Sequence, residues 1–559
     1  MASSLPNLCL RKIFECIEEN EEDKPSLHSC LLVNRHWCQE VVPILWRSPN
    51  AYMSKQLVEV YIACLSDEEK QILNDNGLNL PPSTEIPPTF DYSKYRRVLH
   101  IGGLYHHLWW WCNLRRDECI GAEGRWILTE LLLKLFISRC PAIYRFSCDA
   151  TCLLEKYDIT SYPGAESCLP HIRRLTLTGK RLRKYFEKFS ICHGVCQLKT
   201  YLPIYEWDTE KQCRDIEKFE AEAEGLVDFI QAQNNLQDLE LHGDYYGHDT
   251  GGRIIQALES QAKSLVRLKL SYVRFEGHPP FYGIGACKNL EILEFDGCDG
   301  LTSEMCAPLI TSSLSRLSHL NISNSDLPVD IVSALASNAN ISLREVILCS
   351  TQSSEYLVQV IEALVSHCPN INKFESNQIH GTIEISAICS LLSNSQQLES
   401  LSIYGASLDA EKFLPAIGQS IPSSLRRLSI SSEWQFTTTA FESFLEHCKA
   451  PLTWLTLSGC ECITDEYLEL IVQYLGKTLR HLGVYRAVYT RMESFEKVRK
   501  VIPEVNAPEE NIIRVTRVWI SWAFINIMKW KLLNFVDSEN QLYERDGING
   551  YRSLLFKQL

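Results

Sequence analysis

Residues 452–485 read LTWLTLSGCECITDEYLELIVQYLGKTLRHLGVY. The motif Leu-x-x-Leu-x-Leu begins at Leu452, and an apolar equivalent begins 27 residues later at Leu479. The last two apolar positions of each motif are two residues apart, so both side chains point to one face of a β-strand. This stretch therefore predicts two strands that occupy equivalent positions in a repeat.

The same motif recurs along most of the chain. Apolar residues between the motifs follow helical spacing, as at Tyr356, Val360, Ile361 and Leu364. Each repeat is thus predicted to be one strand and one helix, and stacked repeats share a continuous core. Further motifs, 25 to 29 residues apart, begin at Leu236, Leu265, Leu290, Leu317, Leu343, Ile371, Leu398 and Leu425, and weaker copies begin at Ile143, Ile172 and Leu198.

Two short segments carry a closer resemblance. Residues 459–465 read GCECITD just after the last apolar position of a strand, and residues 297–302 read GCDGLT. Both resemble the cysteine-containing branch of the leucine-rich-repeat superfamily. The resemblance implies an α/β solenoid with parallel strands on its concave face and helices on its convex face. We expect this solenoid to cover residues 93–491, and residues 492–559, which lack the motif, to cap its last repeat.

Residues 1–48 predict three short amphipathic helices. Leu10, Ile13, Phe14 and Ile17 follow the i, i+3, i+4, i+7 spacing of a first helix, which the acidic run 18–23 ends. Ser26 can cap a second helix, and a third follows from Asn34. A module of this size cannot bury all its apolar side chains, so it either packs on the next domain or presents them to a partner.

The same region resembles the F-box motif. The matching segments are Leu5-Pro6, residues 10–14 (LRKIF), residues 26–33 (SLHSCLLV) and residues 34–37 (NRHW), with a long acidic insertion as the one departure. An F-box binds the Skp adaptor and, through it, the cullin of a ubiquitin ligase. The alternative is that these residues form only a local three-helix core. The resemblance implies contact or support roles for Leu5, Pro6, Leu10, Ile13, Phe14, Leu31, Leu32, Val33 and Trp37.

Residues 49–92 are expected to connect this module to the solenoid. A helical stretch at 55–73 is followed by the segment PPSTEIPP at 81–88. Prolines at this density end regular structure and stiffen a linker.

The bulk composition limits the possible partners and compartments. A formal net charge of −14 argues against extensive binding to nucleic acid or to an anionic membrane. The N-terminus has no signal-peptide pattern, so we expect the 23 scattered cysteines to be reduced and the chain to be cytoplasmic and/or nuclear. Residues 518–536 are mostly apolar, but Lys529 and Lys531 favour a buried terminal helix over a membrane span.

The sequence predicts no catalytic, metal or cofactor site. Gly476-Lys477-Thr478 resembles the end of a phosphate-binding loop, but Ile471 stands where that loop needs a glycine, and Gly476 fits a helix C-cap better. Cys192 and Cys196, like Cys460 and Cys462, have no second pair at zinc-ligand spacing. We therefore expect a non-enzymatic chain, with buried structural cysteines.

A protein target is expected on the outward-pointing strand residues. Tyr, Trp and Arg are the usual anchors of protein interfaces. This favours Tyr404, Arg427, Trp454 and Tyr485, near the C-terminal end of the repeats, as a target-binding cluster.

These features predict the substrate-recognition subunit of a Skp–cullin–F-box ligase, which brings an unknown protein target close to the ubiquitination machinery. The main alternative is a non-degradative interaction scaffold. A third possibility, a leucine-rich-repeat GTPase activator, is disfavoured by the F-box resemblance.

Overall fold

The structure of the chain is a computed structural model. It describes residues 6–506 except 20–23, 49–54, 115–121, 149–152, 154–155, 179–181, 202–206, 209–212, 215, 244–250, 276–278, 326, 350–352, 378–381, 405–409, 432–434, 461 and 486–489. Two compact units divide it, residues 1–343 and residues 344–559.

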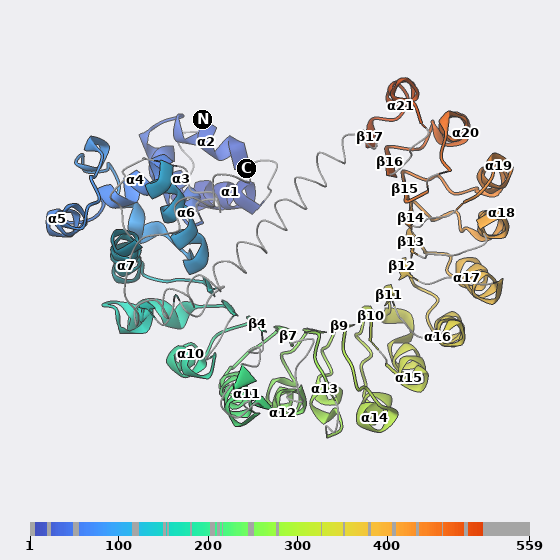
Figure 1. Ribbon diagram of the computed structural model, residues 1–559, viewed down its shortest axis with the longest axis horizontal. Coiled ribbons are helices and arrows are strands. Elements are labelled where there is room, and N and C mark those ends of the chain that lie inside the picture. Colours follow the sequence, from blue (N-terminus) through green and yellow to red (C-terminus); the bar gives the residue numbers. More distant parts are fainter. Residues whose placement is uncertain are drawn as a thin grey trace. The chain divides into compact units, whose positions relative to one another are not determined.

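The first unit begins with helices and continues as repeats of strand and helix (Figure 1). Its leading helices are α1 (Asn7–Glu19), α2 (Lys24–Leu31), α3 (Arg35–Leu45), α4 (Lys55–Ala63) and α5 (Asp67–Asp75). Its parallel strands are β1 (Val98–His100), β2 (Arg145–Cys148), β3 (Arg174–Leu177), β4 (Gln197–Tyr201), β7 (Asp238–His242), β8 (Arg267–Ser271), β9 (Ile292–Asp296) and β10 (His319–Ser323).

Helices cover one face of these strands. They are α6 (Ile101–Leu114), α7 (Ala122–Arg139), α9 (Ala165–Cys168), α10 (Leu182–Lys188), α11 (Ile216–Gln231), α12 (Gly251–Ala257), α13 (Tyr282–Ala286), α14 (Ser303–Thr311) and α15 (Val329–Ala339). Short 3-10 turns lie at Pro82–Thr84, Tyr92–Tyr95, Ile159–Ser161, Leu169–His171, Phe189–Ile191, Leu258–Gln261 and Asn340–Ser342. A separate antiparallel pair joins β5 (Trp207–Asp208) to β6 (Cys213–Arg214).

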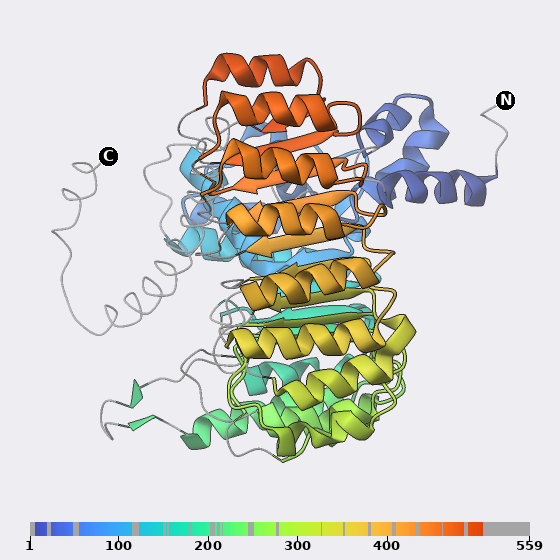
Figure 2. The same cartoon turned by 90° about the vertical axis from the view of Figure 1, so that its right-hand side faces the viewer.

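The second unit repeats the pattern with more regular helices, stacked side by side in Figure 2 (yellow to red). Its parallel strands are β11 (Glu345–Cys349), β12 (Lys373–Ser376), β13 (Ser400–Tyr404), β14 (Arg427–Ser431), β15 (Trp454–Ser458), β16 (His481–Tyr485) and β17 (Glu504–Asn506). Its helices are α16 (Ser354–His367), α17 (Thr382–Asn394), α18 (Ala410–Ser420), α19 (Thr438–His447), α20 (Asp465–Leu475) and α21 (Met492–Arg499).

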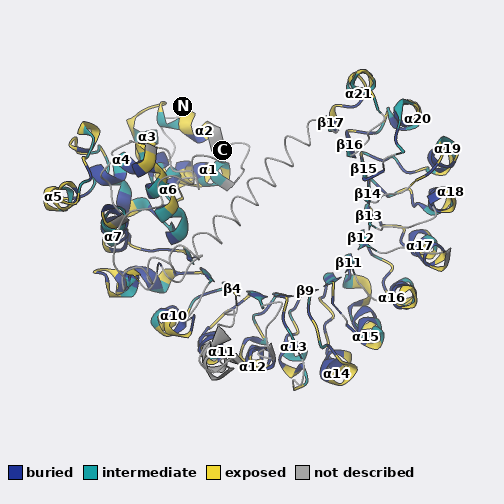
Figure 3. Cartoon of the chain, viewed as in Figure 1, coloured by how far each residue is buried: buried dark blue, intermediate teal, exposed yellow. Residues whose placement is uncertain are grey.

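The register of the strands explains why the leucine motif recurs. In β13 to β16, Leu401, Leu428, Leu455 and Leu482 lie directly beside one another, and all four are fully buried. Each such side chain stabilises the fold by about 1.5–3 kcal/mol. The core runs between the strands and the helices, while the outer sides of the helices are exposed (Figure 3). The predicted α/β leucine-rich-repeat solenoid is thus confirmed.

The cysteines of the glycine-containing turns are part of this core. Cys298 and Cys460 are both fully buried, as predicted for a small residue packed under the strand. The Cys298 thiol donates to the Leu270 carbonyl at 3.3 Å, and its backbone N–H donates to the Ser325 hydroxyl at 2.9 Å. The turn therefore fastens one repeat to both of its neighbours.

One more helix and one more strand follow residue 491, the predicted end of the solenoid. They are α21 and β17, and β17 pairs in parallel with β16. The segments 507–559, including the apolar stretch 518–536, lie outside the described residues. The predicted domain boundaries at 48, 92 and 491 stay predictions. Among the described residues, no helix combines the length and the apolar character needed to cross a bilayer.

Candidate protein-interaction sites

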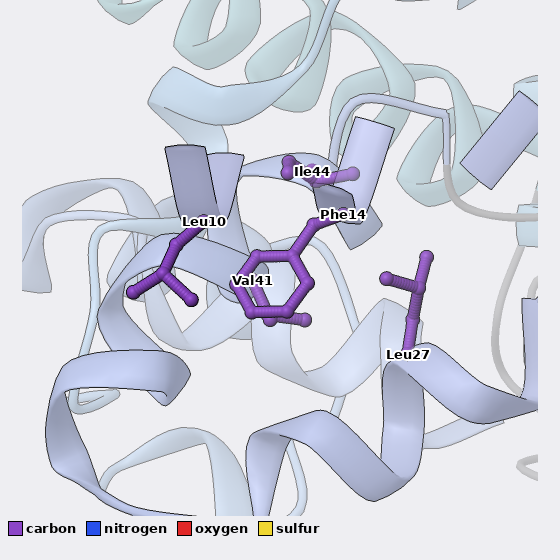
Figure 4. Packing of buried hydrophobic residues seen from close by; sticks show 5 residues of the cluster. All are labelled: Leu10, Phe14, Leu27, Val41 and Ile44. Carbon is purple, nitrogen blue, oxygen red and sulfur yellow. The ribbon is translucent and has the colours of Figure 1, made fainter. Parts of the chain in front are cut away.

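Helices α1, α2 and α3 form a module with its own small core (Figure 4). Phe14 and Trp37 meet edge to face, with ring centroids 5.2 Å apart. Leu31 and Trp37 are partly buried and pack against the core. Leu10 and Phe14 are buried in this core and cannot touch a bound protein. They support the module and are not candidates for direct contact with the adaptor. The core residues are Leu10, Phe14, Leu27, Val41 and Ile44.

Other apolar residues of the module face solvent. Ile13 is 45 % exposed, Leu32 is 87 % exposed and Val33 is 51 % exposed. Pro6 is also exposed, and Leu5 lies outside the described residues. The structure adds Leu8, at 81 % exposed, which lies outside the segments that match the F-box motif. Large apolar side chains exposed to this degree are typical of a surface that meets a partner.

Three exposed apolar side chains of helix α1 lie along one side of the helix. Cys9, Ile13 and Cys16 are all exposed and follow one another at i, i+4 and i+7, which places them along one stripe. Leu32 and Val33 lie in the turn between α2 and α3. Asn34 caps α3 there by accepting the backbone N–H of Trp37 at 2.9 Å. The cap holds the turn in one conformation, so Leu32 and Val33 are presented on a fixed support.

Backbone hydrogen bonds attach the module to the first strand. The carbonyl of Arg47 accepts the N–H groups of Arg97 and Val98 at 2.8 and 3.2 Å. The Arg47 side chain reaches back to α1 and donates to Glu15 at 2.8 Å. That hydrogen bond lowers the pKa of Glu15. Trp46 packs on Tyr61 and Tyr92, with centroids 5.4 and 4.0 Å apart. The module is therefore fixed to the sheet edge by several independent contacts.

Two of the predicted target-binding residues lie side by side in the second unit. Arg427, Trp454, His481 and Glu504 form one row across β14 to β17. Trp454 stacks on His481 with centroids 3.4 Å apart, and the guanidinium of Arg427 lies 5.6 Å from the Trp454 ring. The indole N–H of Trp454 donates to Thr456 at 2.9 Å. We call Arg427, Trp454 and His481 the aromatic row.

The other two candidates lie in a different row. Tyr404 is level with Ser431, and Tyr485 is level with Ser458. Ser431 is four residues beyond Arg427 on the same strand, a separation of about 13 Å. The structure therefore brings Arg427 and Trp454 together, and it places Tyr404 and Tyr485 apart from them and from each other. Glu504 was not found from the sequence, because β17 carries no leucine motif.

The open face of the first unit carries ordered charges. Glu240 accepts hydrogen bonds from Lys199 at 2.9 Å and from His242 at 2.8 Å. The bond from His242, helped by Lys199, lowers the pKa of Glu240 to about 2 against the opposite effect of burial. Arg267 pairs with Glu294 at 2.9 Å one strand further on. Most of these charges are thus neutralised within the sheet.

The structure also describes the segments around Gly476 and Cys192, for which the sequence favoured structural roles. Gly476 is the C-cap of α20, and its N–H donates to the Val472 carbonyl, so the predicted cap is confirmed. Cys192 is buried and donates to the Leu169 carbonyl. Within the part of the chain that is described, no three His, Cys, Asp or Glu side chains are placed to hold a metal ion.

No protein-family model matches this sequence, and no curated protein matches it. Among solved structures, it is similar to a chain in the crystal structure of the Rad7 and Elc1 complex in yeast. The TM-score is 0.38 and the identity 13 %, over 65 % of this chain and 80 % of that one. A leucine-rich-repeat protein of Leptospira interrogans matches with a TM-score of 0.30 and 16 % identity, over 62 % and 92 % of the two chains. A TDR receptor matches with a TM-score of 0.29 and 12 % identity, over 63 % and 65 %.

Proposed function

We propose that this chain is a substrate-recognition subunit of a Skp–cullin–F-box ubiquitin ligase. The observation that carries the proposal is the contrast within the first three helices. Leu10 and Phe14 fill the core, while Ile13, Leu32 and Val33 stay exposed at positions that match the F-box motif. A module that needed only to hold itself together would gain nothing from exposing these side chains to water.

In this proposal the Skp adaptor covers the exposed apolar residues and connects the chain to the cullin. The solenoid holds a protein target, and the aromatic row is the first candidate for that contact, because Trp and Arg dominate interface energies. Trp454 is already oriented by its stack on His481 and its hydrogen bond to Thr456, so little conformational entropy is lost on binding.

Catalysis then belongs to the other subunits. This chain raises the local concentration of the target near the ubiquitin-loaded enzyme and contributes no catalytic residue, metal or cofactor. The proposal places it in the cytoplasm and/or nucleus.

The test is a pull-down of the full chain by recombinant Skp adaptor. The variant Ile13→Glu/Leu32→Glu/Val33→Glu puts three charges on the proposed contact surface. The control Ile86→Glu/Ile383→Glu/Val501→Glu makes the same change at residues that are 70 %, 69 % and 45 % exposed elsewhere. Wild type and control should be retained, and the first variant should be lost, with all three chains melting at similar temperatures. Retention of the first variant, or no retention of the wild type, would rule the proposal out.

The alternative of a non-degradative scaffold makes a different prediction. A scaffold could bind the adaptor without supporting ubiquitin transfer to a bound partner. Reconstitution with cullin, ubiquitin-activating and ubiquitin-conjugating enzymes separates the two functions. Polyubiquitinated partner in the presence of the wild type, and none with the triple-glutamate variant, supports the ligase subunit.

A further inference from the structure

A cleft of about 510 Å³ lies between the three-helix module and the first strands. Three arginines line the cleft: Arg11 from α1, Arg47 after α3 and Arg97 before β1. Tyr95 and Tyr144 line it as well, and Glu15 is the one acidic residue on the lining. The volume of the cleft is within the range of ordinary ligand sites. Its lining carries more positive than negative charge.

The backbone places these side chains in a row. The carbonyl of Arg47 accepts from Arg97, that of Arg97 accepts from Tyr144, and that of Tyr144 accepts from Arg173. Residues 97, 144 and 173 therefore occupy equivalent positions directly before β1, β2 and β3, and Arg47 occupies the place next to residue 97, with about 4.8 Å between neighbours. The row measures roughly 14 Å from end to end, which matches about four residues of extended peptide.

The positive charge continues from the cleft onto the sheet. Arg145 in β2 and Arg174 in β3 are neighbours in register, and both are exposed. Partial desolvation of the Arg145 guanidinium and the adjacent Arg174 charge together lower the pKa of Arg145. Among the described residues, no carboxylate lies within ion-pair distance of Arg11, Arg145 or Arg174, whereas Arg47 is paired with Glu15. We call Arg11, Arg47, Arg97, Arg145, Arg173 and Arg174 the basic strip.

The basic strip is an exception within an acidic chain. The formal net charge is −14, and most charges on the neighbouring strands β4, β7 and β8 are paired with one another. Two like charges held side by side cost free energy, which Asp238, two strands away from Arg174, offsets only in part, and an anionic ligand would reduce that cost further. Arginine also binds carboxylate and phosphate oxygens in a two-pronged geometry that fixes their orientation.

We propose that the cleft and the basic strip bind an extended acidic segment of a partner protein through its carboxylate or phosphate oxygens. A peptide fits better than a nucleic acid, because the strip is short and acidic residues flank both of its ends. Glu15 and Glu18 lie at the Arg47 end, and Asp238 and Glu240 follow beyond Arg174. A nucleic acid would need a longer basic surface. The site shares no residue with the exposed apolar residues Ile13, Leu32 and Val33 or with the aromatic row. It therefore does not depend on the ligase proposal.

The experiment measures fluorescence anisotropy of labelled peptides with the full chain. The probes are about ten residues long, one of alternating Glu and Ser, one with the serines phosphorylated, and one with Gln in place of Glu. The two anionic peptides should bind about tenfold or more tightly than the Gln peptide, and their binding should weaken with added salt. Equal binding of all three peptides would contradict the proposal.

Variants locate the site. Arg11→Glu/Arg145→Glu/Arg174→Glu should weaken binding of the anionic peptides by about tenfold or more. Lys263→Glu/Lys288→Glu/Lys449→Glu changes the net charge equally at exposed residues elsewhere and should leave binding within about twofold of the wild type. Equal losses in both variants would show a bulk charge effect and remove the site. Arg11→Gln/Arg145→Gln/Arg174→Gln, which adds no negative charge, serves if the first variant does not fold and should lose binding in the same direction.

Two further arms identify the source of the anion. Inorganic phosphate at equal ionic strength should compete poorly with the peptides, since it reaches only one or two guanidinium groups at a time. Displacement by low concentrations of phosphate would make the cleft a small-ion site instead. A single-stranded oligothymidine that binds more tightly than either acidic peptide would assign the strip to nucleic acid and overturn the peptide proposal.

Discussion

Arg96 is a charged side chain that is only 5 % exposed. Its Nε donates to the Val98 carbonyl at 3.0 Å, and its Nη1 donates to the Tyr61 hydroxyl at 3.2 Å. The guanidinium also lies 4.8 Å from the centre of the Phe136 ring. Polar partners and aromatic faces thus take the place of a carboxylate around this buried charge.

Replacing this arginine should destabilise the first unit. We expect Arg96→Ala to lower the free energy of unfolding by roughly 2–4 kcal/mol, because it leaves a cavity and an unpaired Tyr61 hydroxyl. Urea unfolding followed by circular dichroism measures the effect. Arg35→Ala is the control, since Arg35 is exposed and has no ion-pair partner among the described residues. A loss no larger than that of the control would contradict the role given to Arg96.

The ionisation of Glu240 makes the stability of the fold depend on pH. Its pKa in the folded chain is about 2, below the ordinary value of 4.5. A carboxyl group with a lowered pKa stabilises the fold above its ordinary pKa, and this contribution is lost as pH falls from about 4.5 toward 2.

We therefore expect Glu240→Gln to be less stable than wild type at pH 6 by about 1–2 kcal/mol, after allowance for solvent screening. The difference should shrink as the pH approaches 2. Thermal or urea unfolding at several pH values measures it. A difference that is constant with pH would show that the effect comes from packing and not from the charge.

At the scale of the turn, Gly297 shows why the repeat needs glycine after the strand. Its φ of +66° lies in the left-handed region, and a Cβ atom there would come within 2.6 Å of the Tyr272 ring. Gly300, three residues on, has a φ of +76°, and no such contact is found for it among the described residues. The two positions therefore separate backbone strain from steric conflict.

Gly297→Ala should cost roughly 2–3 kcal/mol of stability, and Gly300→Ala about 1 kcal/mol. Chemical unfolding of each single variant measures its loss of stability. Equal losses would indicate that Tyr272 moves aside and that only the backbone conformation matters.

The strands could be predicted from the sequence wherever the leucine motif is complete, because a fixed period and a two-residue alternation both constrain the answer. Strand β17 was missed, since Glu504-Val505-Asn506 offers a single buried side chain. The four apolar residues of α1 lie on one stripe by spacing, so the sequence did not separate the buried Phe14 from the exposed Ile13. That separation depends on how α3 packs against α1. The alignment of the motifs at Leu452 and Leu479 already places Trp454 and His481 at equivalent positions, but the stacking of the two rings depends on side-chain rotamers, which no sequence pattern reveals.

At the scale of the whole molecule, more cysteines are buried than exposed among those whose side chains the structure describes. All of these described thiols are free, and Cys9 and Cys16 are the exposed ones. Burial raises the pKa of Cys140, Cys298 and Cys368 to about 12. The thiolate is the reactive form, so these thiols are protected both by access and by ionisation.

Alkylation of the native chain with iodoacetamide at neutral pH should modify Cys9 and Cys16 roughly tenfold or more faster than Cys140, Cys298 and Cys368. Peptide mapping by mass spectrometry assigns each thiol and separates them from Cys119 and Cys152, which lie outside the described residues, and from Cys213 in β6. In urea the difference should vanish. Rapid native labelling of Cys298 would mean that its repeat opens locally.

The hydrogen bonds from Arg97 and Val98 to the Arg47 carbonyl have a mechanical consequence. Arg47 lies two residues after the end of α3, so these bonds tie the three-helix module directly to the edge of the sheet and restrict its rotation. The module and the strands β1 to β3 therefore move together as one body. A partner bound to the module would fix the orientation of these strands more narrowly than a flexible linker would allow.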